Sequence, residues 1–263
     1  MILLIKWIKF KIYWIRIKVI KVLYIKRNTS ITRSEIQREA QENGLFLYID
    51  KQQDWTSHDV VAKLRTMLKI KKIGHSGTLD PMATGLLIIA IGRGATKQIS
   101  ELQAMSKSYT ATMKIGATTK TDDAEANEEN LKDISHINEK EIKNVFLNMQ
   151  GEIAQIPPMF SAKKVKGQKL YHLARKNIEI ELEPSNVFLF ENKITNINLP
   201  YISFEVKCSK GTYIRAIARD IGNELGVGGY LTQLRRTSIE NHRIEDALTL
   251  MELQQIIDEN ESI

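Results

Sequence analysis

One stretch of the chain joins a glycine-rich loop directly to an apolar run, and it constrains the fold more than any other feature. Residues 73–85 read Ile-Gly-His-Ser-Gly-Thr-Leu-Asp-Pro-Met-Ala-Thr-Gly, and residues 86–91 read Leu-Leu-Ile-Ile-Ala-Ile. An unbroken apolar run of this length is typical of a strand buried on both faces. The glycines allow sharp turns and Pro81 stiffens the loop. The segment therefore predicts a buried strand that holds a rigid loop at its start.

The loop contains one acidic residue, Asp80. Pro81 biases the backbone of Asp80 toward an extended conformation, which would hold the carboxylate in one place. A single well-placed carboxylate can attack covalently or take up a proton. Asp before Pro is also common in ordinary turns, so the spacing alone leaves both interpretations open. We regard Asp80 as a candidate catalytic residue.

The rest of the chain mixes strand and helix patterns without a regular rhythm. Strand patterns cover residues 45–49, 109–115, 187–190 and 202–208, and helix patterns cover residues 95–105, 139–149, 170–176 and 212–225, with a further helix beginning near Thr56. Residues 117–138 are polar and acidic and predict a long exposed loop. Because helices do not alternate strictly with strands, the pattern favours an α+β fold over a doubly wound α/β fold.

The charge is concentrated at one end of the chain. Of the 263 residues, 38 are lysine or arginine and 31 are acidic, a formal net charge of +7. Residues 1–34 hold nine of the basic side chains and no acid, so without them the balance turns slightly negative. Residues 1–27 lack the apolar run of a membrane-spanning helix and the cleavage site of a secretory signal. A membrane-surface or RNA-binding segment, an organellar transit peptide and translated upstream sequence all remain open.

The content of cysteine and histidine argues against disulfide or metal chemistry. The single cysteine, Cys208, cannot form an internal disulfide and fits a reducing compartment such as the cytoplasm. The five histidines have no metal-ligand spacing, and no phosphate-binding glycine loop follows a strand. We expect no metal ion and no cofactor.

Several segments resemble, in the same order, the motifs of the TruB-type tRNA pseudouridine synthases. The most specific is the twelve-residue stretch 74–85. The others are Asp-Lys-Gln-Gln-Asp-Trp-Thr-Ser at 50–57, Lys-Ser-Tyr at 107–109, residues 116–123, Gln-Ile-Pro-Pro-Met-Phe-Ser-Ala-Lys at 155–163, Leu-Tyr-His-Leu-Ala-Arg at 170–175, Cys-Ser-Lys-Gly-Thr-Tyr-Ile-Arg at 208–215 and Leu-Arg-Arg-Thr at 234–237. The chain departs from the family's pattern at Gln52, Asp54, Lys120, Phe160 and Ser185.

The resemblance implies the pseudouridine-synthase fold, with a central mixed, largely antiparallel sheet flanked by helices. It also implies isomerisation of the uridine at position 55 in the T-loop of tRNA, by cleavage of the N-glycosidic bond, rotation of the base and reattachment through carbon. We expect a basic extension and linker at 1–44, a catalytic domain at 45–250 and a tail at 251–263. Many relatives carry a C-terminal PUA domain. We expect a short form without it, acting on the T-arm of tRNA as a monomer without a partner protein.

The resemblance also assigns roles to residues. Asp80 matches the family's catalytic acid, and Arg215 matches the arginine that keeps this acid ionised and oriented. Tyr109 matches the ring that stacks on the flipped base. His75 matches the residue that fills the gap left in the RNA. The positions that line the pocket correspond to Lys51, Tyr213 and Leu234. Without the resemblance, each of these residues has an ordinary interpretation as a packing or surface residue.

Other functions remain open from the sequence. The chain could be a pseudouridine synthase that acts on another RNA, as the family's guide-RNA-dependent members do, or a non-catalytic chaperone that uses the same pocket to help tRNA fold. A third alternative is a membrane-surface protein driven by residues 1–27. The combination of Asp80, Tyr109 and Arg215 favours catalysis, because binding alone would not require the acid.

Overall fold

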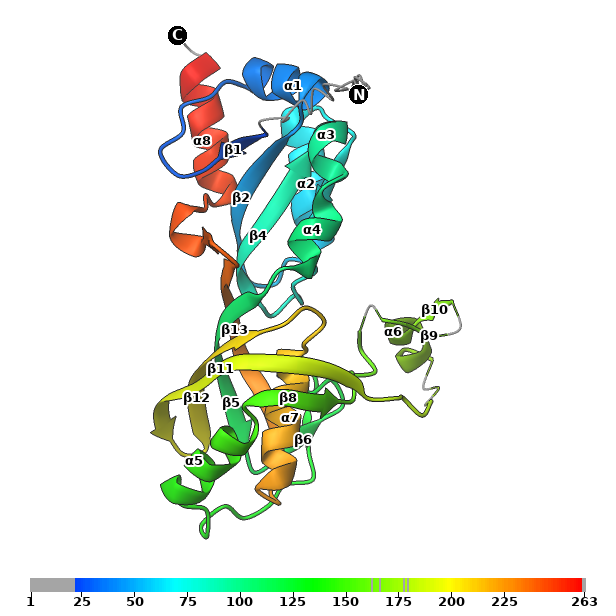
Figure 1. Cartoon of the computed structure of the whole chain (residues 1–263), viewed down its shortest axis with the longest axis vertical. Coiled ribbons are helices and arrows are strands. Elements are labelled where there is room, and N and C mark those ends of the chain that lie inside the picture. Colours follow the sequence, from blue (N-terminus) through cyan, green and yellow to red (C-terminus); the bar gives the residue numbers. More distant parts are fainter. Residues whose placement is uncertain (1–21, 162, 166, 177, 179, 262–263) are drawn as a thin grey trace, which may run out of the picture.

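The fold is organised around one sheet that runs along the whole molecule (Figure 1). The computed structural model describes residues 22–161, 163–165, 167–176, 178 and 180–261. The strand order is β1 (Leu23–Ile25), β2 (Leu45–Lys51), β4 (Thr84–Ile91), β13 (Gly229–Ile239), β5 (Lys107–Ile115), β12 (Tyr201–Cys208), β11 (Ser185–Asn198) and β8 (Gly151–Gln155). The pairs β1–β2 and β4–β13 are parallel and the other pairs are antiparallel. The predicted mixed, largely antiparallel sheet is confirmed.

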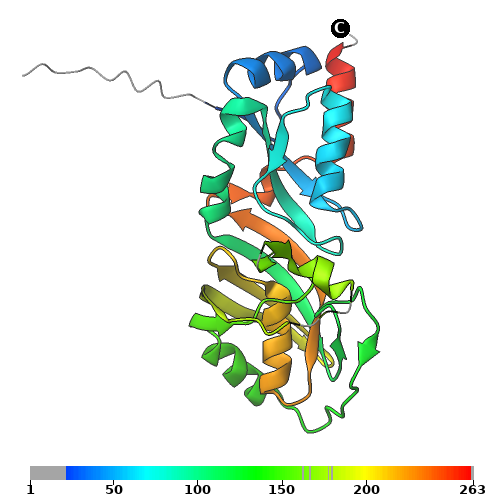
Figure 2. The same ribbon diagram turned by 90° about the vertical axis from the view of Figure 1, so that its right-hand side faces the viewer.

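The sheet has two halves, each with its own helices, and β13 passes between them (Figures 1 and 2). The first half carries α1 (Arg33–Glu42), α2 (Ser57–Leu68), α3 (Gly92–Thr96), α4 (Ile99–Ala104), α8 (Leu250–Glu261) and the short elements β3 (Ile73–His75), β14 (His242–Arg243) and η1 (Ile244–Asp246). The second half carries α5 (Glu139–Asn148), α7 (Ile214–Glu224) and the small ladder of β6 (Thr118–Thr119) and β7 (Glu128–Glu129). A projection holds β9 (Lys164–Val165), β10 (Gln168–Lys169) and α6 (Leu170–Ala174).

The apolar run at 86–91 forms β4 and is buried on both faces, as its composition predicts. Leu87, Ile89 and Ile91 join the large core beneath α2, whereas Leu86 and Ile88 join a second apolar cluster on the opposite face. Helices α3 and α4 contribute Ala95 and Leu102 to that second cluster. The two clusters hold β4 rigidly, so the loop before it starts from a fixed point.

Close contact between β4 and β13 joins the two halves of the sheet. The parallel register pairs Thr84 with Arg235 and Gly85 with Arg236. Gly85 has φ +102°, and a Cβ atom there would lie only 2.3 Å from the backbone oxygen of Arg236. A side chain at position 85 would therefore push the strands apart. Glycine at this position brings the Asp80 loop against the strand that crosses the molecule.

The ordered fold extends beyond the predicted boundaries at residues 45 and 250. β1 pairs with β2, and Ile25 is fully buried. Helix α1 lies in the segment predicted as an extension and linker; it follows the capping residue Thr32 and buries Ile36. The predicted tail forms α8, which buries Leu253 and Ile257 in the large core. Residues 1–21, which carry most of the basic extension, lie outside the described residues.

Some predicted elements differ from those observed. The single helix predicted at 95–105 is observed as two shorter helices, α3 and α4, and Gln98 lies between them as the residue before α4. The stretch 117–138 is not simply an exposed loop, because it contains β6 and β7 and buries the side chain of Asp123. The strand β8 has no counterpart among the predicted strands, and neither has most of β13.

Candidate active site

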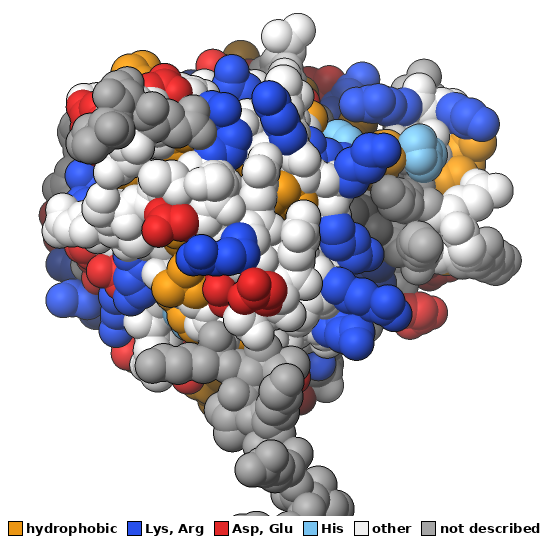
Figure 3. All heavy atoms as spheres, turned by 90° about the horizontal axis from the view of Figure 1, so that it is seen from above, with side chains coloured by type: hydrophobic (Ala, Val, Ile, Leu, Met, Phe, Trp, Pro, Cys, Tyr) orange, Lys and Arg blue, Asp and Glu red, His pale blue; other side chains and the backbone are white. Residues whose placement is uncertain are grey.

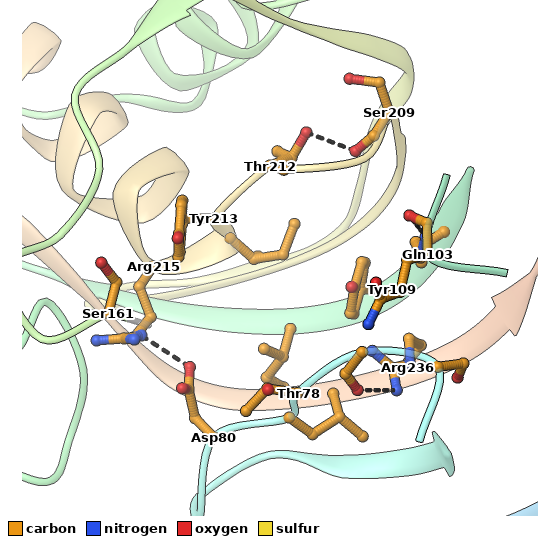
Figure 4. Close-up of a pocket in the computed structure, with 17 residues that line it drawn as sticks. Thr78, Asp80, Gln103, Tyr109, Ser161, Ser209, Thr212, Tyr213, Arg215 and Arg236 are labelled. Carbon is orange, nitrogen blue, oxygen red and sulfur yellow. Dashed lines mark hydrogen bonds and ion pairs between the residues drawn. The ribbon is translucent and has the colours of Figure 1, made fainter. Parts of the chain in front are cut away.

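A cavity of about 290 Å³ lies where the two halves of the sheet meet. Its walls come from the Asp80 loop, the start of β5, the end of β13 and the segment that leads into α7 (Figure 4). Five of the seven predicted site residues line it, namely Asp80, Tyr109, Tyr213, Arg215 and Leu234. The structure thus brings together residues that are up to 154 positions apart in the chain, from 80 to 234.

The charged centre of the cavity is an ion pair between Asp80 and Arg215. The Nε atom of Arg215 lies 2.9 Å from Oδ2 of Asp80 and 3.4 Å from Oδ2 of Asp123. The side chains of Arg215 and Asp123 are only 4% and 2% exposed, whereas that of Asp80 is 34% exposed. Asp80 is therefore the member of this group that a ligand in the cavity can reach.

The guanidinium group of Arg215 is also held by the backbone. Its Nη1 donates to the carbonyl oxygen of Thr121 and its Nη2 to that of Phe160, both at 2.8 Å. Two carboxylates and two carbonyls therefore fix its orientation, and this orientation in turn fixes the Asp80 carboxylate. Sequence reasoning missed Asp123. It stands in a polar acidic stretch whose pattern does not distinguish a site residue from solvated acids.

Lys51 supports the Asp80 loop from outside the cavity. It is fully buried, and its ammonium group donates to the carbonyl oxygens of Gln52, Trp55 and Pro81. Lys51 is not among the residues that line the cavity and lies behind the loop, so its predicted role in lining the substrate pocket stays a prediction. Burial lowers the pKa of Lys51 to about 8, and the nearby Asp80 carboxylate counteracts part of this effect.

Two further contacts fix the path of the loop. Ser57, at the start of α2, accepts a hydrogen bond from the Leu79 backbone nitrogen at 2.8 Å. The backbone nitrogen of Asp54 donates to the carbonyl oxygen of Pro81 at 2.9 Å. Asp54 has φ +65°, the left-handed conformation in which glycine is favoured. The turn at 52–54 therefore keeps a glycine-like geometry although this chain has Asp at that position.

Tyr109 and Tyr213 form two other parts of the wall. Burial raises the pKa of Tyr109 to about 12, so its phenol is neutral and can donate a hydrogen bond. Tyr213 immediately precedes α7, and Gln155 holds its backbone with two bonds. The Tyr213 nitrogen donates to Oε1 of Gln155 at 2.8 Å, and Nε2 of Gln155 donates to the Tyr213 oxygen at 3.1 Å. This pair of bonds positions the segment that presents Arg215.

His75 lies beside the loop rather than in the wall of the cavity. It ends β3, and its Nδ1 accepts a hydrogen bond from the Gly77 backbone nitrogen at 3.3 Å. Burial lowers the pKa of His75, so the neutral ring is favoured near neutral pH. Its predicted role in filling the gap left by a flipped base stays a prediction.

Two buried cations in the wall were not predicted. Arg236 is 2% exposed, with Nε donating to the carbonyl oxygen of Leu86 at 2.7 Å and Nη2 to that of Gly77 at 3.2 Å. Lys107 donates to three carbonyl oxygens at the end of α4, and burial lowers its pKa to about 8. Both stand in segments noted for the family resemblance, which was the only signal available. Within the described residues, no group of three or more His, Cys, Asp or Glu could hold a metal ion.

Comparison with solved structures defines the class of protein. A chain of the crystal structure of a Cbf5-Nop10-Gar1 complex matches with a TM-score of 0.66 and 26% identity, over 90% of the present chain and 62% of that chain. The present chain thus spans less than two thirds of the length of that neighbour. The ten-stranded mixed sheet with flanking helices is the fold of the pseudouridine synthases.

Sequence comparison then gives the family. The profile of the TruB family pseudouridylate synthase N-terminal domain matches residues 65–214, and that of the tRNA pseudouridylate synthase B C-terminal domain matches residues 215–262. The tRNA pseudouridine synthase B of Clostridium kluyveri is 48% identical over 205 residues, which cover 78% of this chain and 70% of that protein. The Chlorobaculum tepidum protein of the same name is 45% identical over 214 residues, covering 80% and 89%. The chain belongs to the TruB family of pseudouridylate synthases.

Proposed function

We propose that this chain isomerises uridine to pseudouridine at position 55 in the T-loop of tRNA, with Asp80 as the catalytic aspartate. The observation that carries the proposal is the partly exposed Asp80 carboxylate, held by buried Arg215 at the edge of a cavity. Relatives at 48% and 45% identity are named tRNA pseudouridine synthase B, which supports tRNA as the substrate.

The cavity suits a nucleoside that has left its stack. A uracil inside folded RNA must be flipped out before an enzyme can reach its glycosidic bond. The Tyr109 ring and the Leu234 side chain would then contact the base, while Asp80 would face the sugar. The Asp80 carboxylate can attack the anomeric carbon or take a proton from the sugar, and Arg215 holds it in the charged, oriented form that either step needs.

The RNA docking surface is expected beside the cavity. Figure 3 shows lysine and arginine side chains gathered in a band along one side of the face seen from above, next to the projection. Such a band matches the phosphates of an RNA stem, and we propose that it receives the T-arm. We further propose that this chain acts as a monomer in the cytoplasm, where its unpaired Cys208 would stay reduced.

Mapping the product of the purified chain tests this proposal. An unmodified tRNA transcript is incubated with the protein alone, and pseudouridine is located by mass spectrometry after site-specific cleavage. We expect pseudouridine at position 55 with the wild-type protein and none with Asp80→Asn, which should still bind the transcript. Turnover by Asp80→Asn at a rate comparable to wild type would refute the role of Asp80. Product at another position would refute the assigned target.

None of the helices in the described part of the chain is long and apolar enough to cross a membrane. The proposed membrane-surface role of residues 1–27 falls mostly on residues outside the described part. Salt-dependent binding of the full chain to anionic liposomes would test it separately from the activity on tRNA.

A further inference from the structure

The wall of the cavity opposite Asp80 holds a buried guanidinium group, that of Arg236, which forms no ion pair with a carboxylate among the described residues. Arg236 donates to two carbonyl oxygens, those of Leu86 and Gly77. Among the residues that the structure describes, none of the ion pairs involves Arg236. Burying an unpaired charge costs several kcal/mol, and a neutral donor would serve the same carbonyls at lower cost. The positive charge itself therefore requires an explanation.

Arg236 faces the place where the base would lie. The register of β13 and β5 pairs it directly with Tyr109, so both side chains project from the same face of the sheet. In Figure 4, Asp80 and Arg215 lie on one side of the cavity, and Tyr109 and Arg236 lie on the other. The ammonium group of Lys107, which donates to three carbonyl oxygens, adds a second positive charge to this side.

The proposed reaction creates a negative charge that this wall could hold. When the N1–C1′ bond breaks, its electron pair leaves with the base, and in the route by attack on the sugar a carboxylate oxygen of Asp80 forms a bond to C1′. The base is then a uracil anion, with charge spread over N1, O2 and O4. After rotation, C5 forms the new bond to C1′ and displaces the Asp80 carboxylate, C5 then loses its proton, and N1 takes up a proton, so Asp80 returns to its starting form. Atoms and charge balance, and the anion exists only between the two bond changes.

We propose that Arg236, with Lys107 beside it, stabilises the uracil anion released by cleavage of the N-glycosidic bond. The inference rests on the proposed function. Arg215 is already paired with two carboxylates, so the uncompensated positive charge of the cavity lies on the Arg236 side. A fixed charge in a water-poor site, aimed where charge develops, is an effective way to lower a barrier.

A change of leaving group separates this role from a structural one. A 5-fluoro substituent withdraws electrons and makes the uracil anion more stable, so the anion depends less on the protein. Arg236→Met should slow the single-turnover loss of uridine from the target position by about 10²-fold. With 5-fluorouridine at that position, the loss of the N-linked nucleoside should slow by about tenfold or less. Arg236→Lys should fall between wild type and Arg236→Met on uridine.

The neighbouring arginine is a matched control. Arg235 projects from the other face of β13 and forms a two-contact ion pair with Asp50, at 3.0 and 2.7 Å. Arg235→Met should slow both substrates by the same factor. Thermal unfolding and tRNA binding in the Asp80→Asn background show whether each variant folds and docks. If Arg236→Met does not fold, Arg236→Lys and Lys107→Met carry the same comparison between the two substrates.

The outcomes are distinct. Equal slowing of both substrates by every substitution at Arg236 and Lys107 would overturn the inference and leave a structural role. A defect confined to tRNA affinity would also overturn it and would indicate a phosphate contact instead. A wild-type protein that converts neither substrate would refute the proposed function rather than this inference.

Discussion

The two walls of the cavity each contain one buried arginine, and the protein surrounds the two arginines differently. On the α7 wall, Arg215 meets the carboxylates of Asp80 and Asp123 and two carbonyl oxygens. On the β13 wall, Arg236 donates to the carbonyl oxygens of Leu86 and Gly77 and lies beside the Tyr109 hydroxyl, and no carboxylate among the described residues forms an ion pair with it. Both side chains are almost completely buried.

The difference indicates how charge is divided in this site. The charge of Arg215 is used inside the protein, where it holds the reactive carboxylate in place. In the part of the chain that the structure describes, the charge of Arg236 is not matched by an acid, so it remains available to a ligand. Substitution of Arg215 should therefore damage the acid and the local fold together, whereas substitution of Arg236 should act mainly on the base.

Among the substitutions that compare the two walls, Arg215→Gln has the largest expected effect. Removing one partner of a buried ion pair leaves Asp80 and Asp123 facing each other without a cation, which costs about 3–5 kcal/mol of stability. We expect kcat to fall by roughly 10³-fold or more, because the carboxylate loses both its orientation and its counter-charge. Turnover assays and urea unfolding measure the two effects.

A control for this substitution lies one turn further along α7. Arg219 pairs with Asp122 at 3.0 Å and with Asp220 at 2.8 Å, outside the cavity. Arg219→Gln should lower kcat less than tenfold. Similar losses for the two variants would mean that the position of the α7 segment, rather than the ion pair with Asp80, is what activity requires.

The second effect in size concerns the ring of Tyr109, on the same wall as Arg236. Stacking of a base on an aromatic ring is worth about 1–3 kcal/mol. Tyr109→Leu should therefore lower kcat/KM by roughly 10- to 100-fold, while Tyr109→Phe keeps the ring and should lose less. Steady-state kinetics on the tRNA transcript measure kcat/KM for both variants and for wild type. Equal losses for Phe and Leu would show that the ring does not lie under the base.

The two walls also differ in how far the sequence predicts them. The apolar run at 86–91 predicts β4 because a strand buried on both faces leaves an unbroken pattern. The family resemblance then supplied Asp80, Tyr109 and Arg215, and all three line one cavity. Arg236 was not predicted, because two adjacent arginines at 235 and 236 look alike in sequence and only the pairing of β13 decides which one faces the cavity.

Other differences have similar physical causes. Lys51 belongs to a family motif, but a sequence motif does not show whether a side chain lines the cavity or supports the Asp80 loop from behind. Asp123 is hidden in a polar stretch because burial of an acid depends on a partner, Arg215, that is distant in sequence. The short β1 is an edge strand of three residues, and its pairing with β2 comes from tertiary contact rather than from local pattern.

A third prediction compares the buried lysines, one behind the acid loop and one in the β13 wall. Burial lowers the pKa of both Lys51 and Lys107 from 10.5 to about 8 in the folded protein. Between pH 8 and pH 10.5 the unfolded chain therefore binds more protons than the folded chain, so each lysine makes the free energy of unfolding rise with pH.

Lys51→Met and Lys107→Met should each remove part of this rise. The slope lost should be on the order of 1 kcal/mol per pH unit for each site. Urea unfolding of wild type and both variants, from pH 7.5 to pH 10, measures it. Parallel curves for a variant and wild type would show that the carbonyl oxygens around that ammonium group hold its pKa at the ordinary value.

The smallest expected effect tests the turn that supports the acid loop. Asp54 adopts φ +65°, which costs a side-chain-bearing residue about 1 kcal/mol, whereas glycine adopts it freely. Asp54→Gly should remove this strain and keep the backbone bond to Pro81, although the more flexible unfolded chain offsets part of the gain. We expect a net stabilisation below about 1 kcal/mol, with kcat changed less than twofold.

Asp54→Val, which is β-branched, should destabilise the protein and loosen the Asp80 loop. Calorimetric unfolding of the two variants measures their melting temperatures. A lower melting temperature for Asp54→Gly than for wild type would show that the Asp54 side chain, and not the geometry of the turn, stabilises the Asp80 loop.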